Sequence, residues 1–257
     1  MKFFPILMLA GALSPVYSAQ AEEVTINFAN LAGADGVALS PVFIALTNSP
    51  SLEYTPGTAA SSAIAQLAET GSGAGLMPEF AGISGAQTAE VVATTNNFTP
   101  PGIYLPGGTG SITLNLDPVK NEYLSFYTMV VPSNDRFIGG EIQLFNSAGQ
   151  FIGANAVIDG SAIWDAGAVA SQVAGAVFIA NDTGSNTPTP NGVITADDNY
   201  SVYNNSLTPA GYSFTNLPGD NTPILGITAA VVPEPPMAWL FASVLWLAAL
   251  ARRRMAA

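Results

Sequence analysis

The stretch YLSFYTMVVPSND, residues 123–135, decides the fold because it joins an apolar run to a polar turn. Residues 123–131 are rich in aromatic and β-branched side chains, which favour an extended strand. Pro132 and the Ser-Asn-Asp that follows are typical of turns. We therefore expect a strand over residues 123–131 that runs into a turn containing Asp135.

Comparable runs recur along the chain, separated by clusters of Gly, Pro and Asn. Val24, Ile26 and Phe28 alternate with polar residues, the spacing of a strand with one buried face. Further candidate strands lie at residues 42–46, 90–95, 111–116, 141–145 and 223–232. Strands at this density, divided by turn signals, predict an all-β, antiparallel sandwich or barrel.

Two segments depart from the strand pattern. Residues 58–70 carry apolar side chains at helical spacing, so we expect one helix that Thr58 caps and Gly71 ends. Residues 180–206 are rich in Asn, Asp, Thr, Pro and Gly, which predicts a long surface loop with at most one short strand. Tyr200 and Tyr203 lie in this loop and are the aromatic side chains that we expect to be most exposed.

Composition excludes several kinds of chemistry. The 257 residues include no Cys and no His, which leaves no thiolate nucleophile, no disulfide and no usual zinc or haem ligands. Residues 22–232 contain seventeen carboxylates and only two basic residues, Lys120 and Arg136, which gives a net charge of 2 − 17 = −15. This balance excludes nucleic acid as a partner, and it suits divalent cations or simply solubility.

The N-terminus is typical of an exported protein. Lys2 precedes the apolar run 3–13, and Ala19-Gln20-Ala21 supplies the small residues of a cleavage site before Glu22. We therefore expect residues 1–21 to be a signal peptide that forms an apolar helix. The remaining body, residues 22–232, has the length of one domain.

Residues 233–257 form a second sorting feature. A Pro-Glu-Pro motif at residues 233–235 precedes an apolar run at 237–251 and three arginines at 252–254. This order resembles the PEP-CTERM sorting signal of Gram-negative bacteria. The resemblance implies a marginal transmembrane helix and an exosortase-type sorting enzyme as partner. It also implies a location at the cell envelope, cell surface or extracellular matrix, often beside exopolysaccharide. A plain membrane anchor is the alternative.

Four sequence blocks in the body resemble the spondin domain of the F-spondin and mindin type. The blocks are Leu39-Ser40-Pro41-Val42; Gly57-x-x-Ala60-Ser61 with Ile64-x-x-Leu67-Ala68-Glu69-x-Gly71; Leu124-Ser125 with residues 129–139; and Trp164-Asp165-Ala166-Gly167. The family fold is an antiparallel β-sandwich of about eight strands, related to calcium- and lipid-binding domains. This agrees with the strand pattern above.

The resemblance also implies a calcium site at one end of the sandwich. The matching acidic positions are Asp135 and Asp165, whereas the third family position falls on Val169, which has no ligand atom in its side chain. Calcium takes six to eight oxygen ligands, so backbone carbonyls, water or another acid would have to complete the site. Whether calcium binds stays open at this point.

The most direct interpretation is a non-enzymatic, surface- or matrix-associated binding or adhesion protein of the spondin type. The alternative is a carbohydrate-binding protein or a carbohydrate-active enzyme, associated with exopolysaccharide, that uses two carboxylates across a cleft. Asp182-Thr183-Gly184 also matches an aspartic-protease loop. That chemistry needs two such carboxylates, and the sequence has no second copy, so we expect an ordinary turn.

Overall fold

The computed structural model describes residues 21–197 and 199–233. The expected signal peptide and the expected sorting segment therefore lie almost wholly outside the described residues. Within the described ranges, no helix has the length and hydrophobicity needed to cross a membrane.

Residues 21–197 and 199–233 form twelve strands and two α-helices. The strands are β1 (Glu22–Asn30), β2 (Ala38–Leu39), β3 (Val42–Thr47), β4 (Gln87–Val91), β5 (Thr95–Phe98), β6 (Ile103–Leu116), β7 (Tyr123–Val131), β8 (Arg136–Gln143), β9 (Ala154–Asp159), β10 (Trp164–Asp165), β11 (Thr195–Ala196) and β12 (Pro223–Val231). The helices are α1 (Ser62–Thr70) and α2 (Met77–Phe80), with three 3-10 turns at Gly73–Gly75, Gly160–Ala162 and Ser201–Tyr203.

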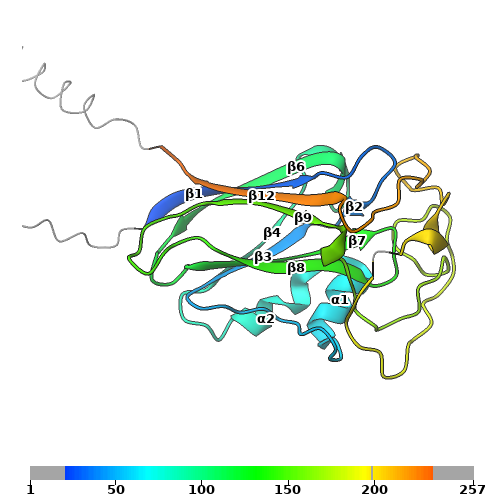
Figure 1. Cartoon of the computed structure of the whole chain (residues 1–257), viewed down its shortest axis with the longest axis horizontal. Helices are drawn as coiled ribbons and strands as arrows, with labels where there is room; N and C mark the ends of the chain where they lie inside the picture. Colours follow the sequence, from blue (N-terminus) through cyan, green and yellow to red (C-terminus); the bar gives the residue numbers. More distant parts are fainter. Residues whose placement is uncertain (1–20, 198, 234–257) are drawn as a thin grey trace, which may run out of the picture.

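The strands form one antiparallel sheet that curls into two facing layers (Figure 1). One layer has the order β9, β12, β1, β6, with β5 on the far side of β6. The other layer has the order β4, β3, β7, β8, β10, β11. Strand β2 pairs with both β6 and β7 and so joins the layers. This arrangement confirms an antiparallel, mostly β fold, and the described residues form twelve strands where about eight were expected, because several are edge or bridging strands as short as two residues.

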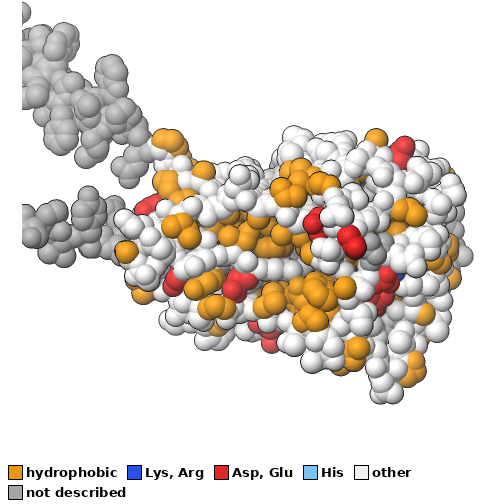
Figure 2. Space-filling view, in the orientation of Figure 1, with side chains coloured by type: hydrophobic (Ala, Val, Ile, Leu, Met, Phe, Trp, Pro, Cys, Tyr) orange, Lys and Arg blue, Asp and Glu red, His pale blue; other side chains and the backbone are white. Residues whose placement is uncertain are grey.

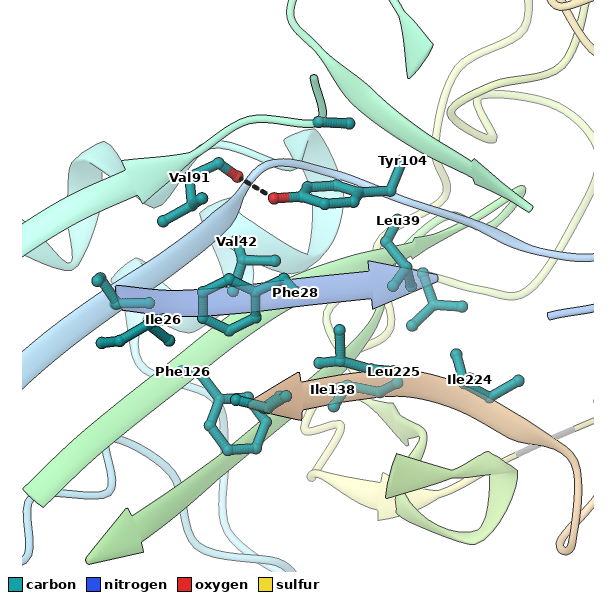
Figure 3. Packing of buried hydrophobic residues seen from close by; sticks show 14 of the residues in the cluster. Ile26, Phe28, Leu39, Val42, Val91, Tyr104, Phe126, Ile138, Ile224 and Leu225 are labelled. Atoms are coloured by element: carbon teal, nitrogen blue, oxygen red, sulfur yellow. Dashed lines mark hydrogen bonds between the residues drawn. The ribbon is translucent and has the colours of Figure 1, made fainter. Parts of the chain in front are cut away.

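The main core lies between the two layers (Figure 3). Ile26 and Phe28 of β1 reach it from one layer, and Phe126 of β7 and Ile138 of β8 reach it from the other. Every residue of β3 is buried, because its second face packs under α1 in a separate apolar cluster. The continuous apolar run of residues 42–46 is thus explained by burial on both faces.

Helix α1 starts later than the sequence predicts. Its N-cap is Ser61, whose Oγ accepts a hydrogen bond from the backbone N–H of Ile64 at 3.2 Å, whereas Thr58 donates its hydroxyl to the carbonyl of Thr55. The predicted end is confirmed, since Gly71 adopts a left-handed φ of 72° at the C-cap. A one-turn helix, α2, follows and was not predicted.

Strand β8 begins at Arg136, five residues before the start expected from the sequence. The reason is the pair Gly139 and Gly140, which weakens a strand signal but is required here. A Cβ atom on Gly139 would lie 2.8 Å from the Tyr54 ring, and one on Gly140 would lie 2.6 Å from the Phe126 ring. The sequence also misses the edge strand β9 and places β4 three residues too late.

The two ends of the described body have different roles in the architecture. Val24 near the start of β1 pairs with Val231 at the end of β12, so both chain ends leave from the same end (Figure 1). The turn at residues 132–135 and the long segment 166–222 gather at the opposite end, which we call the loop end. Figure 2 shows acidic side chains on the drawn face and almost no basic surface.

Candidate functional site at the loop end

The turn between β7 and β8 places Asp135 at the loop end. The hydroxyl of Ser133 donates to the carbonyl of Val130 at 2.6 Å and accepts the backbone N–H of Arg136 at 3.2 Å. These two bonds fold the chain back tightly within the turn. The sequence predicts this turn because Ser and Asp bond readily to nearby backbone groups.

Asp135 is almost completely buried, at 1% exposure. Its Oδ2 accepts the backbone N–H groups of Ala168 at 2.8 Å and Val169 at 3.0 Å. Its Oδ1 is also buried, and the described residues offer it no hydrogen-bond partner. A buried carboxylate oxygen without a partner is unfavourable, so this atom is where the loop end would accept a cation, a proton or water.

Asp165 lies beside Asp135 because β10 pairs with β8, with Asp165 opposite Arg136. Its Oδ1 accepts the backbone N–H of Gly167 at 2.7 Å, and its Oδ2 lies 3.4 Å from the hydroxyl of Ser171. The fold thus brings the two predicted acidic residues to adjacent strand ends. Val169, at the third position, contributes its N–H to Asp135 and no oxygen from its side chain.

Both carboxyl groups bind a proton more tightly than a free aspartate does, and Asp165 contributes to this at Asp135. The pKa of Asp135 is raised to about 6, mainly by burial and in smaller part by the negative charge of Asp165. Burial also raises the pKa of Asp165, although hydrogen bonds and Arg136 oppose this. A cation placed between the carboxylates would relieve this cost by favouring their charged forms.

Arg136 is the functional residue that the sequence analysis missed. It is 1% exposed, and its Nη2 contacts Asp197 Oδ2 at 2.5 Å, the carbonyl of Asn199 at 3.0 Å and the hydroxyl of Ser171 at 3.3 Å. The signals for it were its place in the spondin-like block of residues 129–139 and its position directly after Asp135 as one of two basic residues in the body. A buried guanidinium requires partners, which here come from the distant loop.

The prediction that Tyr200 and Tyr203 are exposed is wrong. They are 1% and 0% exposed, and their ring centroids lie 4.6 Å and 5.3 Å from the guanidinium carbon of Arg136. The polar composition of segment 180–206 suggested a solvated loop. The structure instead folds this segment over Arg136, whose charge the two ring faces attract.

The residues present fit a calcium site only with help from groups other than carboxylates. Among the described residues, no three Asp, Glu, His or Cys side chains are grouped so that they could hold a metal. Asp135 Oδ1 and the Asp165 carboxylate are the two charged ligands available, with the Ser171 hydroxyl beside them. Carbonyl oxygens and water are ordinary calcium ligands, so the arrangement suits a weak site. The charge of Arg136 lowers its affinity further.

The Asp182-Thr183-Gly184 motif forms the expected turn. Asp182 accepts the N–H of Gly175 at 2.6 Å and that of Gly184 at 3.1 Å, so both carboxylate oxygens have backbone partners. These bonds give Asp182 a structural role within segment 166–222.

Comparison with known proteins identifies the family of the chain. No curated protein matches the chain. The family model Spondin_N matches residues 37–209, which are 173 of the 257 residues and include Asp135, Arg136 and Asp165. The matched region contains the second layer of the sheet, both helices and most of the loop end. The chain therefore belongs to the Spondin_N family.

Proposed function

We propose that this chain is an exported, non-enzymatic binding or adhesion protein that contacts its partner through the loop end. Family membership supports an extracellular binding role of the spondin type. The observation that carries the proposal is the placement of Asp135, Arg136 and Asp165 at the end opposite to both chain ends. A body held by its C-terminal segment would direct this end away from the membrane.

Calcium is the proposed cofactor of the loop end. Asp135 and Asp165 would hold it, with Asp135 Oδ1 as the ligand atom that lacks a partner in the described residues. An ion there would add a further link between the turn after β7 and the segment after β10, which hydrogen bonds to Asn134 and Asp135 already join. Two carboxylates give a low charge count, which is typical of millimolar extracellular calcium sites.

The proposed location follows from the ends of the chain. We propose that residues 1–21 direct export through the inner membrane and that residues 233–257 act as a sorting signal for an exosortase-type enzyme. The protein would then reside at the envelope, the surface or the matrix of a Gram-negative cell. Deleting residues 233–257 should release the protein from the membrane fraction. Unaltered fractionation would refute the sorting role.

The non-enzymatic part of the proposal has its own test. A carbohydrate-active enzyme would need two carboxylates facing each other across a cleft. The groove on the outer face of β1 and β12 has no Asp or Glu among its lining residues, which favours binding over hydrolysis there. Incubating the purified protein with polysaccharides and measuring new reducing ends should show no product. Multiple turnovers would overturn the proposal.

The binding role can be tested with variants that remove one charge each. In cells producing the full chain, Asp165→Asn should reduce attachment to the matrix or to neighbouring cells, because it disturbs the loop end. Asp117→Asn is the matched control, since Asp117 follows β6 at the end where the chain termini leave. Attachment that is the same for both variants and the wild type would contradict a binding role for the loop end.

A further inference from the structure

The outer face of the layer β9, β12, β1, β6 presents an uncharged row of polar side chains. Strand register places Asn27 of β1 between Ser111 of β6 and Thr228 of β12, and Thr228 beside Asn155 of β9. All four residues are exposed. Four adjacent strands thus contribute short amides and hydroxyls in one line, in a chain whose net charge is −12.

A groove runs beside this row. The neighbouring register row runs from Val157 through Gly226 and Ala29 to Thr109. The small size of Gly226 and Ala29 leaves a trough between the polar row and the side chain of Leu31, and Val157 closes the trough at one end. The groove has a volume of about 450 Å³, which lies within the range of small-ligand sites. Fourteen residues line it, and none of them carries a charge.

Several polar groups of the groove remain free to bind a ligand. The side-chain Nδ2 of Asn27 donates to the hydroxyl of Thr228 at 3.2 Å. This leaves the side-chain oxygen of Asn27, Oδ1, available to a ligand. Within the described residues, the side chains of Ser111 and Asn155 make no hydrogen bond to another residue. Donors and acceptors therefore line the trough along the polar row and at Thr109, and Leu31 and Val157 add apolar surface to it.

This combination selects a class of ligand. Anionic polymers would find no Lys or Arg in the groove and would meet the negative field of the body. A cation would find no carboxylate in the groove. An uncharged ligand that combines many hydroxyl groups with C–H surface matches both walls. We infer that this groove binds a segment of an uncharged polysaccharide.

The inferred site is separate from the loop end and goes beyond the proposed function. Its residues belong to β1, β6, β9, β12 and the segments next to them, whereas Asp135 directly precedes β8 and Asp165 ends β10. A protein with both sites would hold a partner at its loop end and an uncharged matrix polymer along its side.

The test measures binding of the full chain to three uncharged polymers, namely a dextran, a β-glucan and a galactomannan, with alginate as the acidic comparison. We expect the wild type to bind at least one uncharged polymer and not to bind alginate. Gly226→Val should weaken that binding at least tenfold, because its side chain fills the trough. The nearest atoms to a Cβ there belong to the flexible Leu31 side chain, at 3.2 Å, so the fold should be kept.

Ala230→Val is the matched control, since Ala230 lies four residues further along the same exposed face of β12 and outside the groove. It should bind like the wild type, and Asn155→Ala should weaken binding without changing the thermal midpoint. Binding of none of the three polymers, or equal binding by Gly226→Val and Ala230→Val, would overturn the inference. Neither result would affect the loop-end proposal, which the attachment test of Asp165→Asn decides separately.

Discussion

Arg136 Nη2 lies 2.5 Å from Asp197 Oδ2, although the two residues are 61 positions apart in the chain. Arg136 is the first residue of β8, and Asp197 directly follows the short strand β11. The pair therefore fastens the middle of segment 166–222 to the end of the sheet. The rings of Tyr200 and Tyr203 cover the same guanidinium and exclude water from it.

Replacing Arg136 tests this attachment. Arg136→Met should lower the free energy of unfolding by about 2 kcal/mol, because it removes the buried partner of a half-buried ion pair together with its hydrogen bonds. Urea unfolding at neutral pH measures the change. Lys120→Met is the control, since the Lys120–Asp117 pair at 3.5 Å is solvent-exposed and contributes less than about 1 kcal/mol. Equal stability of the two variants would contradict the role of Arg136.

The hydroxyl groups of Tyr200 and Tyr203 should contribute differently to the free energy of unfolding. Tyr203 donates to Asn134 Oδ1 at 2.6 Å, whereas the hydroxyl of Tyr200 lies at 3.4 Å from the carbonyl of Val130. Tyr203→Phe should therefore cost about 1–2 kcal/mol by leaving a buried amide oxygen short of a donor, and Tyr200→Phe should cost less. Both variants keep the ring over Arg136. Equal losses in thermal unfolding would argue against the hydrogen bond to Asn134.

The carboxyl of Asp135 should make stability depend on pH. Its pKa is raised from 3.8 to about 6 in the folded protein, so the folded state holds the proton more tightly than the unfolded state. Stability from this group is fully present below about pH 4 and is lost as the pH rises through about 6. The loss amounts to about 3 kcal/mol at most.

Asp135→Asn should remove this part of the pH profile. The difference in unfolding free energy between wild type and variant, measured with a calcium chelator present, should change between pH 4 and 6 in favour of the variant. Asn keeps an oxygen that can accept the N–H groups of Ala168 and Val169. Parallel pH profiles would show that burial does not perturb Asp135.

Alanine substitutions at two glycines distinguish the cost of a left-handed backbone from the cost of a steric clash. Gly71 and Gly57 both have left-handed φ angles, of 72° and 81°. A Cβ atom on Gly71 would lie 2.8 Å from the Cβ of Ser40, whereas one on Gly57 would meet nothing within 4 Å. Gly57→Ala should cost about 1 kcal/mol from φ alone, and Gly71→Ala should cost more. Thermal unfolding that ranks the two variants in reverse would contradict the packing of α1 against Ser40.

Local patterns predict much of this fold. Strand β7 occupies the predicted residues 123–131, because an apolar, aromatic run is a strong local signal. The turn containing Asp135 follows from its Pro-Ser-Asn-Asp sequence, and its closeness to Asp165 follows from the resemblance to the spondin domain. Strand β9 escapes prediction because its sequence, ANAVID, is weakly apolar, as suits an edge.

The environment of Arg136 could not be predicted in the same way. Its partners Asp197, Asn199 and Tyr200 lie more than 60 residues away in a segment whose composition resembles a solvated loop. Periodicity describes how a residue relates to its own strand or helix, and it carries no information on contacts between distant segments. For the same reason, the burial of Tyr203 became evident only in three dimensions.

The central claim is that Asp135 and Asp165 make the loop end a cation-dependent binding end. The most direct test is the thermal midpoint of the protein with and without 10 mM calcium, a concentration of about ten times a millimolar dissociation constant. We expect a rise of about 3 °C for the wild type and for Asp117→Asn, and none for Asp135→Asn or Asp165→Asn. A wild-type midpoint that calcium leaves unchanged would contradict it.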